Sequence, residues 1–138
     1  MSKLFLFLLI TFLLESCTEK LFNPIKGGYY SPSFQTSQKD AIFIHGDINY
    51  MESKKSIKVR AIEACRIVSS MKQGGAFMIL AKGAYITAYY SLAKSLVAAG
   101  DSVKRGQEIG ELFCRDSVLS NSLEITVEKD GKYIRPKW

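Results

Sequence analysis

The C-terminal stretch SNSLEITVEKDGKYIRP, which begins at Ser120, gathers side chains that can do chemistry. In a β-strand, Ser120, Ser122, Glu124 and Thr126 would share one face, because side chains two residues apart point the same way. Two hydroxyls and a carboxylate can bind a ligand, but a serine hydroxyl cannot act as a base near pH 7, as histidine can. What this face can do therefore depends on which other side chains lie beside it.

Metal-binding side chains are scarce in the rest of the chain. Its 138 residues include one histidine, His45, and three cysteines. Zinc sites combine several Cys, His, Asp or Glu ligands, and the distant Cys65 and Cys114 with one histidine do not form such a cluster. We expect no metal ion and no other cofactor. Cys65 and Cys114 either form a disulfide, which an oxidising compartment permits, or stay as two buried free thiols.

The elements that must position these side chains are predicted to be strands, since short apolar or alternating segments recur between glycine turns. The expected strands are Ala41–Asn49, Ile57–Val68 with a bend near Glu63–Ala64, Ala76–Ala81, Ala84–Tyr90, Glu108–Cys114, Leu123–Glu128 and Lys132–Ile134. Turns are expected at Met71–Gly75, Lys82–Gly83 and Asp130–Gly131, and sharp reversals at Gly100 and Gly106 around an inserted Val103. Only Leu92–Ala99 has a pattern compatible with a short helix. The prediction is one small all-β domain.

The N-terminus reads as a targeting segment rather than as part of the domain. An apolar run from Leu4 to Leu14 is too short to span a bilayer comfortably and suits a signal-peptide core. The sequence that ends at Cys17 resembles the bacterial lipoprotein cleavage box, in which the cysteine becomes the lipidated N-terminus. We expect a signal peptide at 1–16, a flexible tether at 17–40 and the domain at 41–138. A plain secretory signal or a membrane anchor is the alternative, and each places the domain outside the cytoplasm.

The charge of the chain limits its partners. The formal net charge is +6, and the basic residues are scattered rather than gathered in a block. An exported basic protein meets anionic lipids, cell-wall polymers and acidic proteins, although a solvated basic surface explains the same charge. We expect no nucleic acid among its partners.

Four segments, in order, carry a resemblance to a known family: IKVRAIEACRIV, GGAFMILAKGAYITAYYSL, VAAGDSVKRGQEIGELF and SNSLEITVEKDGKYIRP. Their order and spacing over residues 41–136 resemble the zinc peptidase domain of the LytM and lysostaphin type. The resemblance implies a β-rich domain with two sheets of the barrel-sandwich kind. Active members of that family cleave peptide cross-links of the bacterial cell wall.

The resemblance also shows what this chain lacks. Ser91 occupies the position of one catalytic histidine, and Ser120 and Ser122 occupy those of a catalytic and a metal-binding histidine. The remaining metal positions fall on Phe43 and Asp47 in one alignment and on His45 and Asn49 in another. Neither alignment retains both ligands, so the resemblance implies a peptidase-like domain without its metal site. Residual peptidoglycan endopeptidase activity is disfavoured.

This pattern predicts a pseudoenzyme of the cell envelope. The leading hypothesis is a lipoprotein, anchored to a bacterial membrane through Cys17 with its domain on the periplasmic side, that binds or regulates cell-wall hydrolysis machinery, for example by activating an amidase. The alternatives are direct binding of peptidoglycan, with Tyr85, Tyr89, Tyr90, Lys82 or Arg115 as contacts, and a structural subunit of an envelope complex. The candidate groove residues are His45, Asp47, Tyr89, Ser91, Ser120, Ser122 and Glu124.

Overall fold

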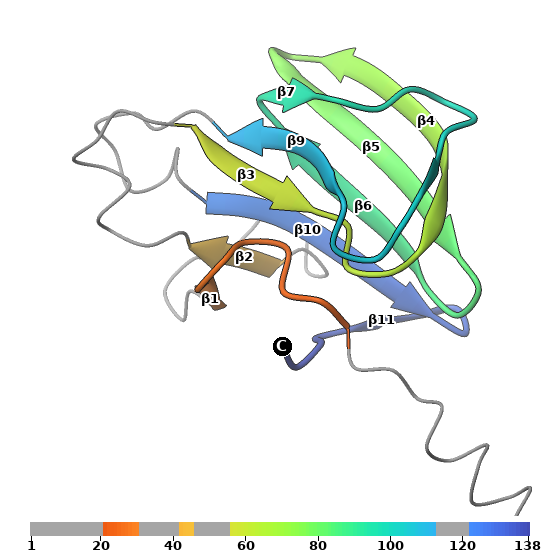
Figure 1. The fold of residues 1–138 in the computed structure, drawn as a ribbon. Helices are drawn as coiled ribbons and strands as arrows, with labels where there is room; N and C mark the ends of the chain where they lie inside the picture. Colours follow the sequence, from red (N-terminus) through yellow and green to blue (C-terminus); the bar gives the residue numbers. More distant parts are fainter. Residues whose placement is uncertain (1–20, 31–41, 46–55, 113–121) are drawn as a thin grey trace, which may run out of the picture.

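The computed structural model describes residues 21–30, 42–45, 56–112 and 122–138 (Figure 1). Within these ranges the chain forms strands and turns, and no helix there could cross a membrane. The strands are β1 (Tyr29–Tyr30), β2 (Ile42–His45), β3 (Ile57–Arg60), β4 (Cys65–Gln73), β5 (Ala76–Gly83), β6 (Thr87–Leu92), β7 (Lys94–Ser95), β8 (Ser102–Val103), β9 (Glu108–Leu112), β10 (Ser122–Lys129) and β11 (Lys132–Ile134). The all-β prediction is confirmed.

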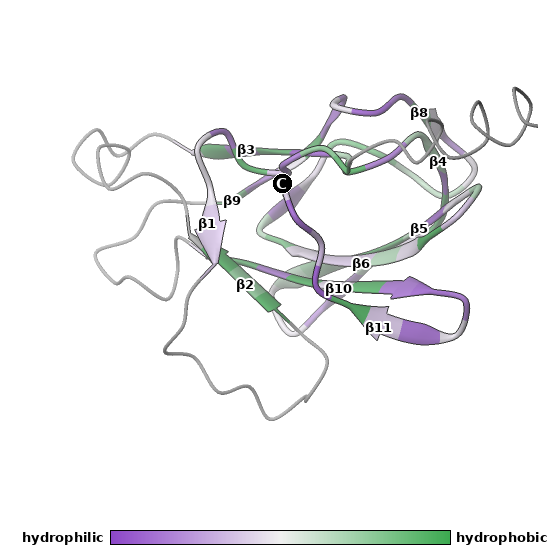
Figure 2. Cartoon of the chain, turned by 90° about the horizontal axis from the view of Figure 1, so that it is seen from below, coloured by the Kyte–Doolittle hydropathy of each residue, from purple (hydrophilic) through white to green (hydrophobic). Residues whose placement is uncertain are grey.

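The strands form two antiparallel sheets. The larger sheet has the order β1-β2-β10-β6-β5-β4-β8, with β11 paired to β10, and the smaller sheet has the order β3-β9-β7. Figure 2 shows β3 and β9 lying across the interior from β5, β6 and β10. The two sheets thus form two layers, as the family resemblance implied, and β5, β6 and β10 of the larger sheet each have one face toward the interior and one away from it.

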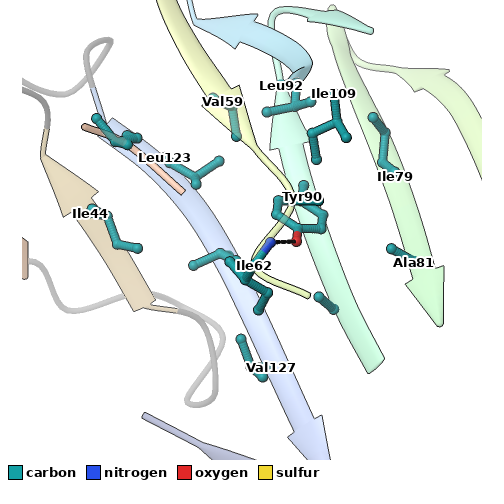
Figure 3. Close-up of a cluster of buried hydrophobic side chains, with 14 of the residues drawn as sticks. Ile44, Val59, Ile62, Ile79, Ala81, Tyr90, Leu92, Ile109, Leu123 and Val127 are labelled. Atoms are coloured by element: carbon teal, nitrogen blue, oxygen red, sulfur yellow. Dashed lines mark hydrogen bonds between the residues drawn. The ribbon is translucent and has the colours of Figure 1, made fainter. Parts of the chain in front are cut away.

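Apolar residues at alternating positions fill the space between the sheets (Figure 3). From the larger sheet come Ile79 and Ala81 of β5, Ala88, Tyr90 and Leu92 of β6, and Leu123, Ile125 and Val127 of β10. From the smaller sheet come Ile57, Val59, Ile109 and Leu112. Each of the larger buried side chains stabilises the fold by about 1.5–3 kcal/mol. Because strand side chains alternate, burial of this set directs the intervening residues of β6 and β10 to the opposite face.

Two turns follow the sequence prediction. Gly100 and Gly106 both have positive φ, 93° and 80°, and Val103 between them is only 5% exposed. Asp130 and Gly131 also have positive φ, 52° and 75°, which fits the two-residue hairpin between β10 and β11.

Two predicted turns are wrong in position, because the strands around them are longer than expected. β4 continues to Gln73, so the turn narrows to Gly74–Gly75, and β5 continues through Lys82 and Gly83. Gly83 serves close packing instead, since a Cβ there would lie 2.6 Å from the Glu63 carboxylate. Local glycine patterns do not distinguish these two uses.

The short helix considered for Leu92–Ala99 does not form. Lys94 and Ser95 pair with Glu111 and Gly110 of β9 instead. This pairing requires a glycine at position 110, because a Cβ on Gly110 would lie 2.3 Å from the Lys94 carbonyl oxygen. The backbone hydrogen bonds that a helix would supply locally are therefore made with a distant strand.

The expected tether at 17–40 is wrong for residues 21–30, which pack against the domain. Ile25 is 1% exposed, and the Arg60 backbone N–H donates a hydrogen bond of 2.8 Å to the Pro24 carbonyl. Proline and glycine in this segment indicated a loop, but the apolar residue between them is part of the core. The packed part of the domain thus includes a segment well before residue 41.

The same segment contacts the C-terminus. The Tyr30 ring lies 5.9 Å from the Trp138 ring, and the Tyr30 hydroxyl donates a hydrogen bond to the Pro136 carbonyl. Burial raises the pKa of Tyr30 to about 12, although the nearby Arg135 guanidinium acts in the opposite direction. These contacts tie the segment before β2 to the end of the chain.

Candidate functional site

The outward face of the larger sheet contains an open groove of about 360 Å³. Its lining comes from two pairs of consecutive strands that lie far apart in the chain, β5 with β6 and β10 with β11. The lining residues, which we call the groove, are Met78, Tyr89, Ser91, Glu124, Thr126 and Tyr133. The volume is in the range of pockets that bind small molecules or one peptide segment.

Strand pairing places the carboxylate of the groove among its neighbours. On β10, Glu124 is the Cα partner of Ser91 on β6 and of Phe43 on β2. Directly opposed residues of antiparallel strands have Cβ atoms about 4.5–5.5 Å apart, so Glu124 and Ser91 are close neighbours on this face. Thr126, two residues further along β10, is the partner of Tyr89.

The positions that the family resemblance assigned to metal and catalysis meet on the same sheet. Ser122 on β10 is the Cα partner of His45 on β2, and Ser91 lies on the other side of β10. Ser122 is 9% exposed, whereas Ser91 and Glu124 are half-buried. Ser91 thus lies beside Glu124 and lines the groove, whereas Ser122 is not among the residues that line it. Asp47, Asn49 and Ser120 lie outside the described residues.

The two serines at this place are not the usual ligands of zinc. Ser91 and Ser122 supply neutral hydroxyls, whereas protein zinc sites use thiolate, imidazole and carboxylate ligands. Among the described residues, no three His, Cys, Asp or Glu side chains are grouped so that they could hold a metal ion. The groove can accept and donate hydrogen bonds through Glu124 and its hydroxyls, and it presents aromatic and thioether surface.

Other residues that the sequence proposed as contacts lie elsewhere. Tyr90 is in the core, and Tyr85, 71% exposed, is in the turn before β6 and does not line the groove. Lys82 is exposed on β5, and Arg115 lies outside the described residues. Of the three aromatic candidates, only Tyr89 is a groove residue.

Of the two cysteines in the predicted domain, the structure describes only Cys65. Cys65 is half-buried and forms no disulfide with another described residue, and burial, with the Glu63 carboxylate nearby, raises the pKa of its thiol to about 11. Cys114 lies outside the described residues, so the choice between a disulfide and two free thiols stays a prediction.

Three groove residues were not on the list of candidates from the sequence: Met78, Thr126 and Tyr133. Thr126 continues the period-two face of Ser122 and Glu124, and that signal was sufficient to find it. Tyr133 comes from β11, which the predicted Asp130–Gly131 hairpin already places beside β10, whereas Met78 comes from β5 and reaches the groove only because β6 pairs with β10.

The fold and its groove can be compared with known protein families. The model of Peptidase family M23 matches residues 45–136, which is more than half of the chain. The chain therefore belongs to peptidase family M23, in agreement with the resemblance read from its sequence. A search of curated protein sequences found no match.

Solved structures agree on the fold. The SpoIIQ–SpoIIIAH pore-forming complex contains a chain with a TM-score of 0.59 and 19% identity, over 84% of this chain and 87% of that one. A zinc-containing peptidase from Vibrio cholerae has a TM-score of 0.59 and 17% identity, over 84% of this chain and 39% of its own. Lysostaphin has a TM-score of 0.56 and 18% identity, over 80% of this chain and 48% of its own. At these identities the likeness concerns the fold alone.

Proposed function

We propose that this chain is a non-catalytic M23 domain that serves as a protein-binding subunit of a cell-envelope complex and regulates cell-wall hydrolysis through its groove. The observation that carries the proposal is chemical. The resemblance to the family places Ser91 and Ser122 at positions of histidines, and the whole chain contains one histidine, His45. Zinc-dependent hydrolysis needs three protein ligands, an open coordination position and a proton acceptor, and this set of residues does not supply them.

A groove without catalytic residues can still bind a partner protein. Tyr89 is 37% exposed and Tyr133 is 52% exposed, so both rings are available to a partner. Exposed aromatic residues in a concave surface are frequent anchors of protein interfaces. The similarity to a chain of the SpoIIQ–SpoIIIAH complex supports a role as one subunit of an assembly.

The cellular place of the proposed complex rests on the sequence. The apolar run from Leu4 to Leu14 and the box that ends at Cys17 support a lipid-anchored protein with its domain on the periplasmic side. An envelope protein such as an amidase would then be within reach of the groove.

Direct binding of peptidoglycan is the second candidate. The same exposed tyrosines favour it, because aromatic rings can stack against sugars and peptide stems as well as against protein side chains. The two candidate functions predict different binding partners. A peptidoglycan-binding domain should bind isolated cell-wall sacculi, whereas a subunit of an envelope complex should bind a membrane or periplasmic protein.

Zinc content and hydrolysis test the loss of catalysis. The full chain, purified in detergent without a metal-binding tag and incubated with excess zinc, is expected to retain far less than one zinc per chain after dialysis. It is also expected to release no soluble fragments from sacculi. One tightly bound zinc per chain together with hydrolysis would refute the proposal.

Partner retention tests the role of the groove. We would immobilise the full chain, pass over it a detergent extract of the envelope, and compare Tyr89→Ala with Tyr85→Ala. The two tyrosines are both exposed, but only Tyr89 lines the groove. A protein partner should be lost with Tyr89→Ala and kept with Tyr85→Ala. Equal retention by both variants would contradict binding through the groove, and co-sedimentation with sacculi alone would favour the second candidate.

A further inference from the structure

Glu124 is the charged member of the six side chains that line the groove. It sits on a chain whose formal net charge is +6, so its carboxylate is a local exception to the overall charge. Among the described residues it forms no salt bridge, whereas Glu111 on the smaller sheet is paired with Lys58. The groove therefore presents a half-buried negative charge that the described part of the chain does not neutralise.

The neighbours of Glu124 suit a cation. Ser91 is its cross-strand partner and Thr126 follows it on the same face, so two hydroxyls are placed to share hydrogen bonds with a group bound to the carboxylate. Tyr89 and Tyr133 add aromatic rings to the same lining, and aromatic faces attract ammonium and guanidinium groups.

An apolar path leads away from the carboxylate across the sheet. Met71 on β4 is the Cα partner of Met78 on β5, Met78 is the partner of Ser91, and Ser91 is the partner of Glu124. Met71 is 61% exposed and Met78 is 36% exposed. Figure 1 shows these four strands side by side in the larger sheet. Methionine side chains adapt to the shape of an apolar partner, so this row can hold a varied side chain.

We propose that the groove binds a polypeptide segment in which a lysine or arginine pairs with Glu124 and an adjacent apolar side chain covers Met78 and Met71. The inference rests on the proposed function and names the chemistry of its partner. An acidic segment would place like charges together, and a neutral one would leave the Glu124 carboxylate desolvated without a partner, which is unfavourable. A charge-assisted hydrogen bond to this carboxylate is stronger than a neutral one, so the basic residue determines specificity.

Methionine methyl groups provide the probe. The chain has four methionines, of which Met71 and Met78 are on the groove row. We would label the full chain in detergent micelles with ¹³C-methyl methionine, assign Met78 with Met78→Leu, and titrate with the blocked peptide acetyl-Leu-Lys-Leu-amide. The control is the same peptide with an acetylated lysine, which removes the charge and keeps the apolar residues.

The expected result is a saturable shift of the Met78 methyl signal with the lysine peptide. The acetylated peptide should bind about 10-fold more weakly, and Glu124→Gln should weaken the lysine peptide by about the same factor, as expected for loss of one charged hydrogen bond. Glu108→Gln, which removes an exposed carboxylate outside the groove, should change nothing.

Equal binding of the two peptides, or full binding to Glu124→Gln, would overturn the inference. So would binding of a soluble cell-wall peptide with a free amine when the lysine peptide does not bind. These failures are separate from failure of the proposed function, because an envelope partner that depends on Tyr89 would still be retained. The proposed function fails instead if zinc is bound and sacculi are cleaved.

Discussion

Replacement of Tyr90 by phenylalanine tests how the groove strand is held to the rest of the fold. Tyr90 lies on β6 between the groove residues Tyr89 and Ser91, but it points into the core and is 1% exposed. Its hydroxyl accepts a hydrogen bond of 3.1 Å from the Ile62 backbone N–H, which belongs to the bend between β3 and β4 (Figure 3). The hydroxyl thus connects β6 to the bend through which the chain passes from the smaller sheet to the larger one.

The expected cost follows from the unpaired donor. Tyr90→Phe retains the ring and its packing but leaves the buried Ile62 N–H without an acceptor, which costs about 1–3 kcal/mol. At roughly 4 °C per kcal/mol for a chain of this size, the midpoint of thermal unfolding should fall by roughly 4–12 °C. The matched control is Tyr89→Phe, since its exposed hydroxyl faces the groove and its loss should change stability by less than about 0.5 kcal/mol.

Thermal unfolding and urea unfolding, both followed by circular dichroism, measure the midpoint and the free energy of unfolding of each variant. The pH dependence of the free energy of unfolding is a second check. Burial raises the pKa of Tyr90 above its ordinary value near 10, so the unfolded chain loses this proton first as pH rises. The stability that Tyr90 contributes is therefore complete below about pH 10 and declines above it, and Tyr90→Phe should decline less steeply. If Tyr90→Phe is as stable as the parent chain, or Tyr89→Phe is less stable, the hydrogen bond does not hold β6 to the bend between β3 and β4 as described.

Three further outcomes are expected. Gly110→Ala should prevent β7 from pairing with β9, because the new methyl would lie 2.3 Å from Leu92, and loss of more than about 2 kcal/mol in urea unfolding would show it. The hydrogen bond from Lys58 lowers the pKa of Glu111. The pair therefore stabilises the fold above the ordinary carboxyl pKa near 4, and this stabilisation is lost as the pH falls below that value. In Glu111→Gln, the free energy of unfolding should fall less steeply on the acid side. Ser122→His should bind no zinc in elemental analysis, since one added imidazole does not complete a ligand set.

Each of these outcomes has a result that would contradict it. Unchanged stability of Gly110→Ala would mean that β7 and β9 are further apart than the sheet requires. An acid profile of Glu111→Gln identical to that of the parent would remove Lys58 as the cause of the shifted carboxyl pKa. Zinc binding or sacculus hydrolysis by Ser122→His would overturn the alignment of this serine with a metal-binding histidine.

Strand patterns and turn residues made much of the fold predictable. The period-two alternation around Glu124 identified both the buried face of β10 and the face that carries the groove, because this period is a local property of extended backbone. Asp130 and Gly131 likewise predicted the hairpin that joins the consecutive strands β10 and β11. Local signals misplaced a turn at Gly83, which is needed for close packing. They also suggested a helix at Leu92–Ala99, because they do not show that Gly110 leaves room for Lys94 and Ser95 to pair with β9.

The sequence by itself determined which reactive side chains are present: one histidine and a row of hydroxyls with a carboxylate. It also determined which strands bury alternate residues. Only the tertiary structure decided that Met78 joins Glu124 in one groove, and that the segment around Ile25 belongs to the core. The physical reason is the range of the interactions. Alternation and turn geometry involve residues a few positions apart, whereas strand order is set by how two whole apolar faces fit together across the interior.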